Sequence, residues 1–598
     1  MKKMKMNIWK LGIVALGIAM SVSCTEIKFG DKFLGDAPES SGSTLETMFS
    51  SRVNSEMVLT KIYSTLPYGL SSSTGGLRMG GNYLESVTDL CQSLRSQGND
   101  SPFFDYYTGL LSANNVTANK DMYAFGKEAD WTGIKYARIY LDNIDRVPDM
   151  TAAEKEAKAA EAKTLLALTY FNMLRYIGGV IWLEHSVGVN DDMNFPRSTF
   201  AESVENINAL LDEAIAVPSF TWKWDVGNDG RMSKAAAMAL KFKLLQFAAS
   251  PMFNSDTKWH PQADEYTCYG NYDRNRWVAA QQAGKAFFDA LAANGGYALI
   301  QPAAATHQAR REAYRSGYYD RCEEILISLR KGNYFDDTYG GDNGTFVNAR
   351  LYIGPTLNYV DMFPWEDGSE FPADTFDWEN PDRDPFFVYT DGVMVPVRDP
   401  RLYENVAVPG DIYYNGGYVP SYPPVNTGRA TTGFHVMKFF LQEAADRANR
   451  LVQFPHTRLA EIMLGYAEVL NEVNNGPTAE AYKLVNDVRA RVGLSALPSG
   501  MNHDSFFETV LRERAMELGF EEVRWYDLIR YTRAEDFRKT LYGLDIVGDK
   551  ANATSFTYKK VELTKRYWAT NWDTKWYLSP IPTTEINKNY GMTQNPGW

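Results

Sequence analysis

Cys24 is the residue whose position in the sequence most directly indicates a chemical modification. Four lysines lie among the first ten residues, an apolar stretch covers residues 11–22, and small side chains lead into the cysteine. This stretch is shorter than the roughly 20 apolar residues of a membrane-spanning helix, which is typical of an export signal. Bacterial lipoprotein processing cleaves before such a cysteine and acylates its thiol. We therefore expect a signal peptide over residues 1–23 and a lipid on Cys24.

An acylated Cys24 would hold the chain on a membrane without a spanning helix. Each acyl methylene that enters the bilayer contributes about 0.8 kcal/mol, and stable anchoring takes more than one chain. The next residues are polar and rich in Ser, Gly and Asp, so we assign residues 24–42 to a lipidated tether. The alternative is an ordinary signal peptide that happens to be followed by a cysteine.

A series of charged side chains near the C-terminal end could perform acid–base chemistry. Glu513, Glu517 and Glu521 recur every four residues, so a helix would place them on one face. A pair of carboxylates flanking a sugar is what a glycoside hydrolase requires. Arg524 and Arg530 lie close by, however, and the chain holds 74 acidic residues, so close carboxylates arise by chance. We favour a structural ion-pair network over a catalytic pair.

Other signatures of catalysis or metal binding are missing from the sequence. It contains no HExxH, GxSxG or phosphate-binding glycine motif, and its six histidines are scattered. One acidic run could bind a structural calcium ion, but it lacks the order of an EF-hand loop, so we read it as a solvated acidic loop. Its members are Asp374, Asp377, Glu379, Asp382 and Asp384. The sequence therefore predicts a protein that is not an enzyme and has no cofactor.

The overall charge and the cysteines exclude several further classes. The chain has 61 basic and 74 acidic residues and a formal net charge of -13, which argues against a nucleic-acid-binding surface. Beyond Cys24, the cysteines are Cys91, Cys268 and Cys322, which are far apart and form no CxxC pair. They indicate neither a zinc site nor a disulfide framework, although one disulfide among the three stays open.

Long amphipathic helices dominate the first half of the chain. Thr199 and the glutamate three residues later predict a capped helix start, whereas Gly178 and Gly295 predict helix ends. The helical segments that we expect are 44–66, 131–147, 151–176, 199–216, 233–250 and 276–293. In sequence order, helices pair into hairpins over residues 131–176, 199–250 and 456–492, which resembles tetratricopeptide packing. The expected fold is mainly α, a scaffold of helical hairpins.

Residues 295–455 have a different pattern. Gly, Pro, Asp and Asn recur among aromatic residues, and short apolar runs at 325–329 and 406–408 predict strands. We expect a loop-rich subdomain with short strands over 295–455, on a scaffold built from about 43–294 and 456–535. Residues 536–598 would form a C-terminal tail, and 43–598 a single domain.

Several segments, in the same order along the chain, resemble the SusD/RagB family. The longest is RERAMELGFEEVRWYDLIR at residues 512–530, and the chain ends on QNPGW at 594–598. Shorter matches are GRMSKAAA at 230–237, ASPMFN at 249–254, RDPRL at 398–402 and LSPIPTTEI at 578–586. Together with the lipoprotein signal, these matches identify the chain as a member of this family of outer-membrane nutrient-binding lipoproteins of Bacteroidetes.

The resemblance implies four tetratricopeptide-like helix pairs and a ligand face made by the inserted segments. It also implies a partner, a SusC-like TonB-dependent transporter to which captured oligosaccharide is delivered. The protein would face the cell exterior, anchored in the outer membrane by the lipid on Cys24. These expectations rest on the resemblance alone.

Exposed aromatic residues among Asn and Asp predict where a glycan would bind. The faces of sugar rings carry C–H bonds that pack on aromatic rings, and their hydroxyls need polar partners. Residues of this kind in the inserted segments are our ligand-binding candidates: Tyr83, Phe104, Trp259, Tyr272 and Trp378. The alternative for each is that it fills the core of the subdomain.

Three other functions remain open from the sequence. The RagB branch of the family suggests a peptide-binding uptake lipoprotein instead of a glycan binder. A fimbrial or adhesin-like structural lipoprotein would share the lipid signal but is usually rich in strands. A polysaccharide-degrading lipoprotein is disfavoured because catalytic motifs are missing.

Overall fold

The computed structural model describes twelve segments of the chain. They are residues 44–66, 84–93, 104–116, 129–188, 190–192, 194–319, 321–333, 353–414, 417–418, 432–439, 451–548 and 555–598. The expected signal peptide, Cys24, the tether and Tyr83 lie outside the described residues. Within those segments, no helix combines the length and the apolar character needed to cross a membrane.

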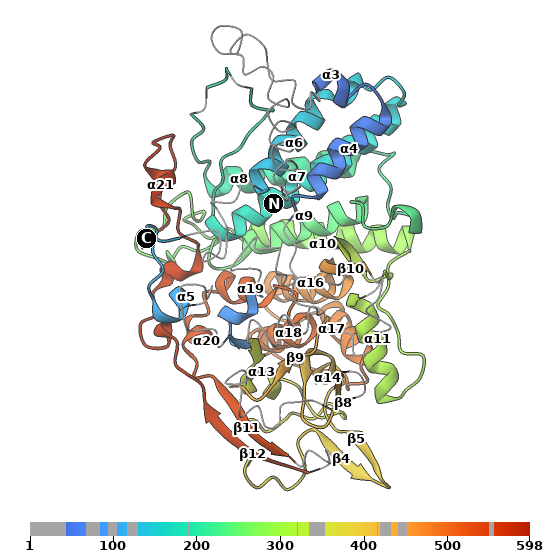
Figure 1. The fold of residues 1–598 in the computed structure, drawn as a ribbon, viewed down its shortest axis with the longest axis vertical. Coiled ribbons are helices and arrows are strands. Elements are labelled where there is room, and N and C mark those ends of the chain that lie inside the picture. The colour runs from blue at the N-terminus through green and yellow to red at the C-terminus, as the bar shows by residue number, and fades with distance from the viewer. Residues whose placement is uncertain are drawn as a thin grey trace, which may run out of the picture.

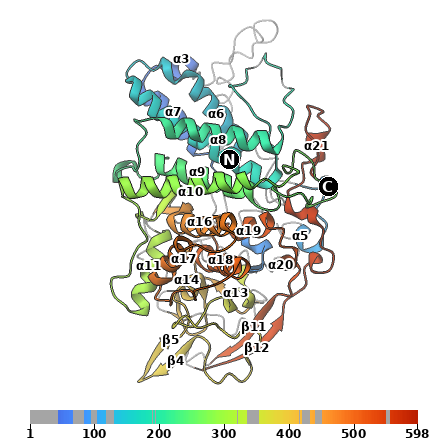
Figure 2. The ribbon, with the colours of Figure 1, turned by 180° about the vertical axis from the view of Figure 1, so that it is seen from behind.

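Helices predominate, as expected, and they stack in antiparallel pairs (Figures 1 and 2). The pairs α6–α7, α8–α9 and α16–α17 confirm the three predicted hairpins, and α4 packs on α6. Helix α10 packs against both α9 and α16. It therefore joins the scaffold helices that precede the loop-rich segment to those that follow it. The scaffold helices are α4 Arg52–Tyr63, α6 Ala129–Asn143, α7 Ala152–Ile177, α8 Phe200–Ala216, α9 Lys234–Ala249, α10 Arg274–Asn294, α16 Leu459–Asn474, α17 Ala479–Arg491 and α18 His503–Leu518.

Local capping explains where these helices begin and end. Thr151 and Thr199 each form a full capping box with the glutamate three residues later. Gly178 and Gly295 end α7 and α10 with φ angles of +78° and +64°, which a residue with a side chain rarely adopts. The predicted boundaries therefore agree with the structure to within two residues at these helices.

Small residues let the scaffold helices approach closely. A Cβ atom placed on Gly284 of α10 would lie 2.4 Å from the ring of Tyr466 on α16. Three buried alanines of α9, together with residues of α10, α16, α17 and α18, form part of one hydrophobic core. A second, larger core extends through α6–α9 and into the C-terminal segments. Close packing of this kind fixes the relative positions of the helices.

The segment over 295–455 carries short strands but also a helix that the sequence pattern did not indicate. This helix is α11, His307–Tyr319. The strand predicted at 325–329 is β2, Ile325–Asn333, which pairs antiparallel with β10, Leu451–Arg458. The strand predicted at 406–408 is β6, Val406–Ala407, paired with β9, His435–Val436. The remaining hairpins are β4–β5 (Phe387–Thr390, Val393–Pro396) and β7–β8 (Ile412–Tyr414, Gly417–Tyr418).

Short elements complete the fold around this frame. In the first half they are α3 Leu45–Met48, β1 Cys91–Ser93, which pairs with β3 Ile353–Pro355, and α5 Phe104–Thr108. In the second half they are α13 Leu357–Asp361, α14 Leu402–Asn405, α19 Arg524–Arg530, α20 Ala534–Arg538, β11 Tyr542–Gly548, β12 Phe556–Glu562 and α21 Thr583–Ile586. The β4–β5 and β11–β12 hairpins lie at the end of the molecule opposite α3 and α4 (Figure 1).

The C-terminal residues are bound to the first half of the chain by Arg197. Its guanidinium donates to the carbonyl oxygen of Gly179 at 2.8 Å and to that of Thr593 at 3.1 Å. It also donates to the side-chain oxygen of Asn595 at 2.8 Å, and Asn595 in turn donates to the carbonyl of Ser579. The predicted tail is therefore packed on the body of the protein.

Candidate functional site

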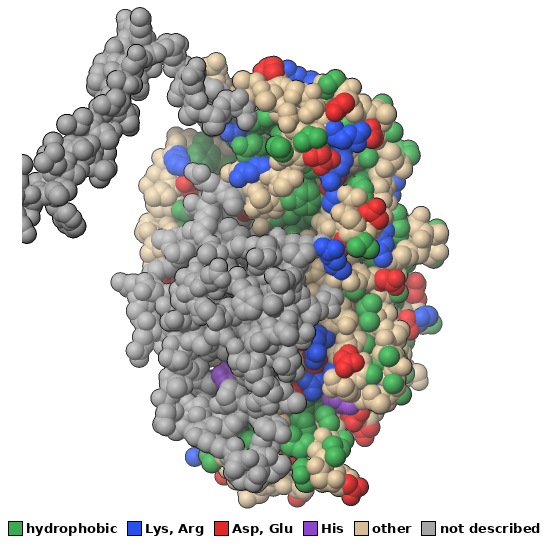
Figure 3. Space-filling view, turned by 45° about the vertical axis from the view of Figure 1, so that its right-hand side comes forward, with side chains coloured by type: hydrophobic (Ala, Val, Ile, Leu, Met, Phe, Trp, Pro, Cys, Tyr) green, Lys and Arg blue, Asp and Glu red, His purple; other side chains and the backbone are tan. Residues whose placement is uncertain are grey.

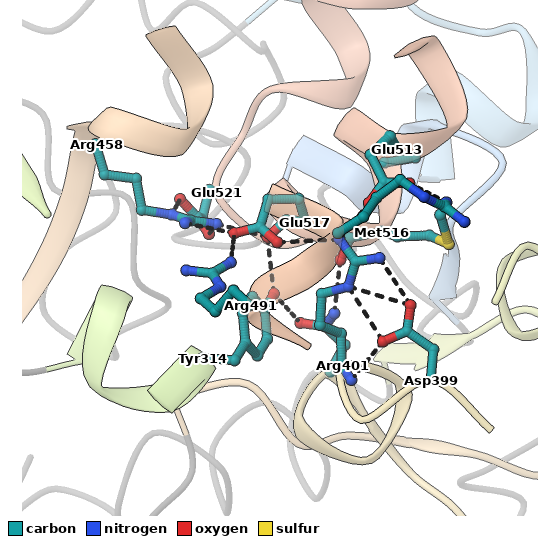
Figure 4. A network of polar contacts seen from close by, with 12 residues as sticks. Tyr314, Asp399, Arg401, Arg458, Arg491, Glu513, Met516, Glu517 and Glu521 are labelled. Carbon is teal, nitrogen blue, oxygen red and sulfur yellow. Dashed lines mark hydrogen bonds and ion pairs between the residues drawn. The ribbon is translucent and has the colours of Figure 1, made fainter. Parts of the chain in front are cut away.

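The three glutamates of the acidic series lie at the centre of a buried ion-pair network (Figure 4). Glu513 and Glu517 belong to α18, whereas Glu521 lies beyond its end at Leu518, so one helix does not carry all three as expected. Glu517 accepts from Arg401 at 3.1 Å and from Arg458 at 2.7 Å, and it pairs with Arg491 as well. Glu521 pairs with Arg458 at 2.8 Å. The side chains of Glu517 and its three arginine partners are fully buried.

The network joins segments that are far apart in the sequence. Arg401 follows β5 and also pairs with Asp399 and Glu513, at 2.7 Å each. Although burial by itself would raise the pKa of Glu517, Arg491, Arg458 and Arg401 hold it well below its usual value. Each of these carboxylates faces a buried guanidinium. The arrangement agrees with the structural network that we favoured and does not resemble two acids flanking a substrate.

The other charged residues of this region extend the same pattern. Arg514 pairs with Asp527 at 2.7 Å, and Arg530 pairs with Asp527 at 2.9 Å. Arg530 also donates to Glu468 of α16 at 2.6 Å. Arg524 pairs with Asp89 at 2.8 Å, which attaches α19 to the first half of the chain. In this region, charged residues at helical spacing form ion pairs that connect one helix to another.

Glu85 is a buried carboxyl group that forms no ion pair with the described residues. One of its oxygens accepts from the backbone N–H of Glu522 at 2.6 Å, and the other has no hydrogen-bond partner among the described residues. Burial, with a smaller contribution from the nearby Glu522, raises the pKa of Glu85 to about 8. The protonated form is therefore the one that the fold favours.

We expect a Glu85→Gln variant to lose part of the pH dependence of folding. Because the folded pKa is about 8 and the unfolded value is 4.5, the native state holds an extra proton between these values. The free energy of unfolding of the wild type then falls as pH rises through this window. At about 1.4 kcal/mol per pKa unit, the wild type should lose roughly 4 kcal/mol more than Glu85→Gln between pH 5 and pH 9. Urea unfolding at both pH values measures this, and parallel curves would contradict it.

The acidic run of the loop-rich segment caps turns. Asp377 accepts from the backbone N–H groups of Glu379 and Asn380, both at 3.0 Å. Asp384 accepts from the N–H of Phe386 at 2.9 Å and from the hydroxyl of Tyr558 at 2.8 Å. Across the described segments, no three His, Cys, Asp or Glu side chains gather as a metal site would require. The described cysteines Cys91, Cys268 and Cys322 are all free thiols.

Of the five ligand-binding candidates, Tyr272 is the one whose side chain is described and exposed. It is 51% exposed, and its backbone N–H donates to Asp256 at 3.0 Å. Trp259 lies in the same connection between α9 and α10 but is only 8% exposed, with its ring packed against Tyr577. The two residues therefore belong to the same loop, but only the side chain of Tyr272 is exposed.

Trp378 is buried, with 3% of its surface exposed. Its ring packs against Phe376 at a centroid distance of 4.8 Å and against Tyr558 at 6.1 Å. This is the core position that we considered as the alternative for each aromatic candidate. The backbone of Phe104 starts α5, while its side chain, like Tyr83, lies outside what the structure describes. Ligand binding by these five residues stays a prediction.

A cavity of about 500 Å³, which no sequence pattern indicated, lies beside the scaffold helix α18. Its walls come from α13, the following loop, α18, α20 and the β11–β12 hairpin. Asn358 fixes β11 to α13, because its side chain accepts from the N–H of Tyr542 at 2.8 Å and donates to the carbonyl of Thr540 at 3.0 Å. The volume falls in the range of about 300–1,000 Å³ that is typical of small-ligand sites. We call it the Asp361 cavity, after the acid at the end of α13.

The distribution of surface charge does not indicate which kind of ligand the protein binds. On the face drawn in Figure 3, acidic and basic side chains of the described residues are interspersed with apolar ones. No single sign of charge covers the described part of that face.

The fold is similar to that of several solved structures. A crystal structure of a SusD-like protein from Bacteroides fragilis superimposes with a TM-score of 0.71 at 22% identity, covering 94% of this chain and 100% of that one. A laminarin-binding SusD-like protein superimposes with a TM-score of 0.56 at 18% identity, covering 92% and 100% of the two chains. The architecture is thus the SusD-like fold.

The sequence comparisons agree with this fold. Residues 327–598 match the SusD family model. SusD-like protein P38 of Formosa agariphila is 23% identical over 435 residues, which cover 68% of this chain and 73% of that protein. The C-terminal part of the chain is thus similar in sequence to the SusD family, and the fold as a whole is similar to that of SusD-like proteins.

Proposed function

We propose that this protein is a cell-surface lipoprotein that binds an oligo- or polysaccharide and delivers it to a SusC-like TonB-dependent transporter. The observation that carries the proposal is the SusD-like fold, which extends over 92% of the chain in its similarity to a laminarin-binding protein. The buried, fully paired carboxylates of α18 support a binding protein without hydrolytic activity.

The anchoring part of the proposal rests on the sequence around Cys24. The cysteine follows a basic, apolar leader, and about 20 polar residues separate it from α3, which begins at Leu45. Lipid on Cys24 would place the protein in the outer membrane, facing the exterior, where a transporter could receive its ligand. A peptide ligand, as in the RagB branch, is the second candidate.

A glycan panel against soluble protein that begins after Cys24 tests the proposal. Affinity electrophoresis in gels that contain single polysaccharides gives a first screen, and calorimetry then gives affinities. Retardation by at least one polysaccharide supports the glycan function. Folded protein that no polysaccharide retards, but that binds peptides, would favour the RagB-type function instead.

We expect Tyr272→Ala to weaken glycan binding by about 2- to 10-fold, because an exposed ring that stacks on a sugar contributes roughly 0.5–1.5 kcal/mol. Its exposure of 51% means that the change removes little packing. Tyr389→Ala is the matched control, because Tyr389 is 58% exposed and lies on β4. Calorimetry with the polysaccharide found in the panel measures both variants. Equal affinities of wild type and Tyr272→Ala would remove Tyr272 from the site.

A further inference from the structure

The Asp361 cavity is lined by equal numbers of positive and negative side chains. Most of these charges are already neutralised by partners. Arg512 pairs with Glu370 at 2.5 Å, Lys539 pairs with Asp536 at 2.6 Å, and Arg533 donates to Glu508 at 3.1 Å. The charged residues of the lining are Arg512, Arg524, Arg533, Lys539 and Lys560, and Asp361, Glu370, Asp374, Glu508 and Asp536. A lining of this kind gives no net attraction for an ion, yet offers many hydrogen-bonding groups.

Two groups in the lining have capacity left for a ligand. One carboxylate oxygen of Asp361 has no hydrogen-bond partner within the described segments. Lys560 forms no ion pair with any described residue, and its ammonium group lies 4.5 Å from the centre of the Tyr542 ring. A buried polar group without a partner costs free energy, so a ligand that bonds to it gains more than it would at an exposed group.

The protonation of Asp361 suits hydroxyl groups. Burial and, to a lesser extent, the nearby Asp374 outweigh Arg398 and Lys560, which act in the opposite direction, and together these effects raise the pKa of Asp361 to about 7. Near neutral pH the carboxyl group therefore exists in both forms. It can donate a hydrogen bond as an acid and accept one as a carboxylate, and a sugar hydroxyl does both as well.

The apolar part of the lining suits the C–H faces of a sugar ring. Phe371 and Tyr542 contribute aromatic rings, and Met362 and Leu511 contribute aliphatic surface. The far side of Phe371 is held by Arg398, whose guanidinium carbon lies 3.6 Å from the ring centre. Arg398 donates in addition to the carbonyl oxygens of Val360 and Phe363, so this wall is fixed before any ligand arrives.

We propose that the Asp361 cavity binds a neutral sugar unit, held by hydrogen bonds to Asp361 and Lys560 and by contact with Phe371 and Tyr542. The inference rests on the proposed function, because it takes the ligand to be carbohydrate. It adds a site that none of the five aromatic candidates identified. This site would receive a single sugar, such as a chain end or a released monosaccharide, because its volume is about 500 Å³.

The test compares two variants that alter the cavity with one that does not. Ala373→Trp fills the cavity, because Ala373 lines it, and Asp361→Asn removes the titrating carboxyl group. Thr375→Trp introduces the same bulky side chain two residues away, at an exposed position outside the lining. Saturation-transfer NMR and calorimetry follow glucose, galactose, mannose and xylose, with glucuronate and glycine as charged and zwitterionic probes. Thermal melting shows which variants are folded.

The expected result is binding of at least one neutral sugar, weakened at least tenfold in Ala373→Trp and Asp361→Asn and unchanged in Thr375→Trp. If both cavity variants bind the sugar as the wild type does, the inference falls. It also falls if no monosaccharide binds while the polysaccharide of the panel does, and the proposed function then stands. Binding of glycine or glucuronate alone at this cavity would overturn the assignment to a neutral sugar. If neither polysaccharide nor monosaccharide binds, the proposed function fails as well.

Discussion

Replacing Glu517 by alanine is expected to lower the free energy of unfolding by about 3–5 kcal/mol, since breaking a buried ion pair leaves its partner charge uncompensated. Three guanidinium groups, those of Arg401, Arg458 and Arg491, surround this carboxylate, and all are fully buried. Removing it leaves mutual repulsion among them in a medium that screens charge poorly. Urea unfolding at neutral pH measures the loss.

An exposed ion pair provides the control for this prediction. Asp289 pairs with Lys285 at 2.7 Å on the surface of α10, and both side chains are about two-thirds exposed. Asp289→Ala should change the free energy of unfolding by less than about 1 kcal/mol. Equal losses in Glu517→Ala and Asp289→Ala would show that the network contributes no more than a surface pair does.

We expect Trp378→Ala to destabilise the protein by about 3–5 kcal/mol, although the sequence nominated Trp378 for ligand binding. The ring fills a space among Phe371, Phe376, Phe386 and Tyr558, so its removal leaves a cavity in the subdomain core. Glycan affinity per folded molecule should stay near that of the wild type. Chemical unfolding and calorimetry on the same preparations separate the two effects.

Trp378→Phe is the conservative control, because a phenylalanine ring keeps most of the apolar contacts. It should lose clearly less stability than the alanine variant. A Trp378→Ala protein with full stability and tenfold weaker glycan binding would instead place the ring in the binding site.

The helical scaffold could be predicted because its signals are local. A threonine and a glutamate three residues apart specify the start of α7 and of α8, and both contacts form within a single helical turn. The helix α11 lacked such a signal. Its buried face includes Arg311, which is neutralised by Glu404 and Asp411 almost 100 residues later. The arginine interrupts a buried face that otherwise follows helical spacing, at Ala313, Tyr314, Gly317 and Tyr318, and the prediction overlooked it.

The site could be predicted less well because its properties depend on distant partners. The spacing of the glutamates indicated one helical face. Whether that face is catalytic or structural depends on Arg401, Arg458 and Arg491, which come from other segments and pair with Glu517. Trp378 is buried by Tyr558, which follows it by 180 residues. The Asp361 cavity is likewise formed by four separate segments, and their approach to one another could not be seen in the sequence of any one of them.

The contacts of Arg197 affect the order in which the parts of the chain can fold. A ribosome or a secretion channel releases the N-terminal half first, and at that moment the guanidinium lacks its partners Thr593 and Asn595, which lie almost 400 residues later. A buried donor without an acceptor is unfavourable, and contacts of such long sequence separation slow folding. The helical half therefore reaches its final form only after the C-terminal segment has emerged. Truncation near the end of the chain should for this reason destabilise the N-terminal helices.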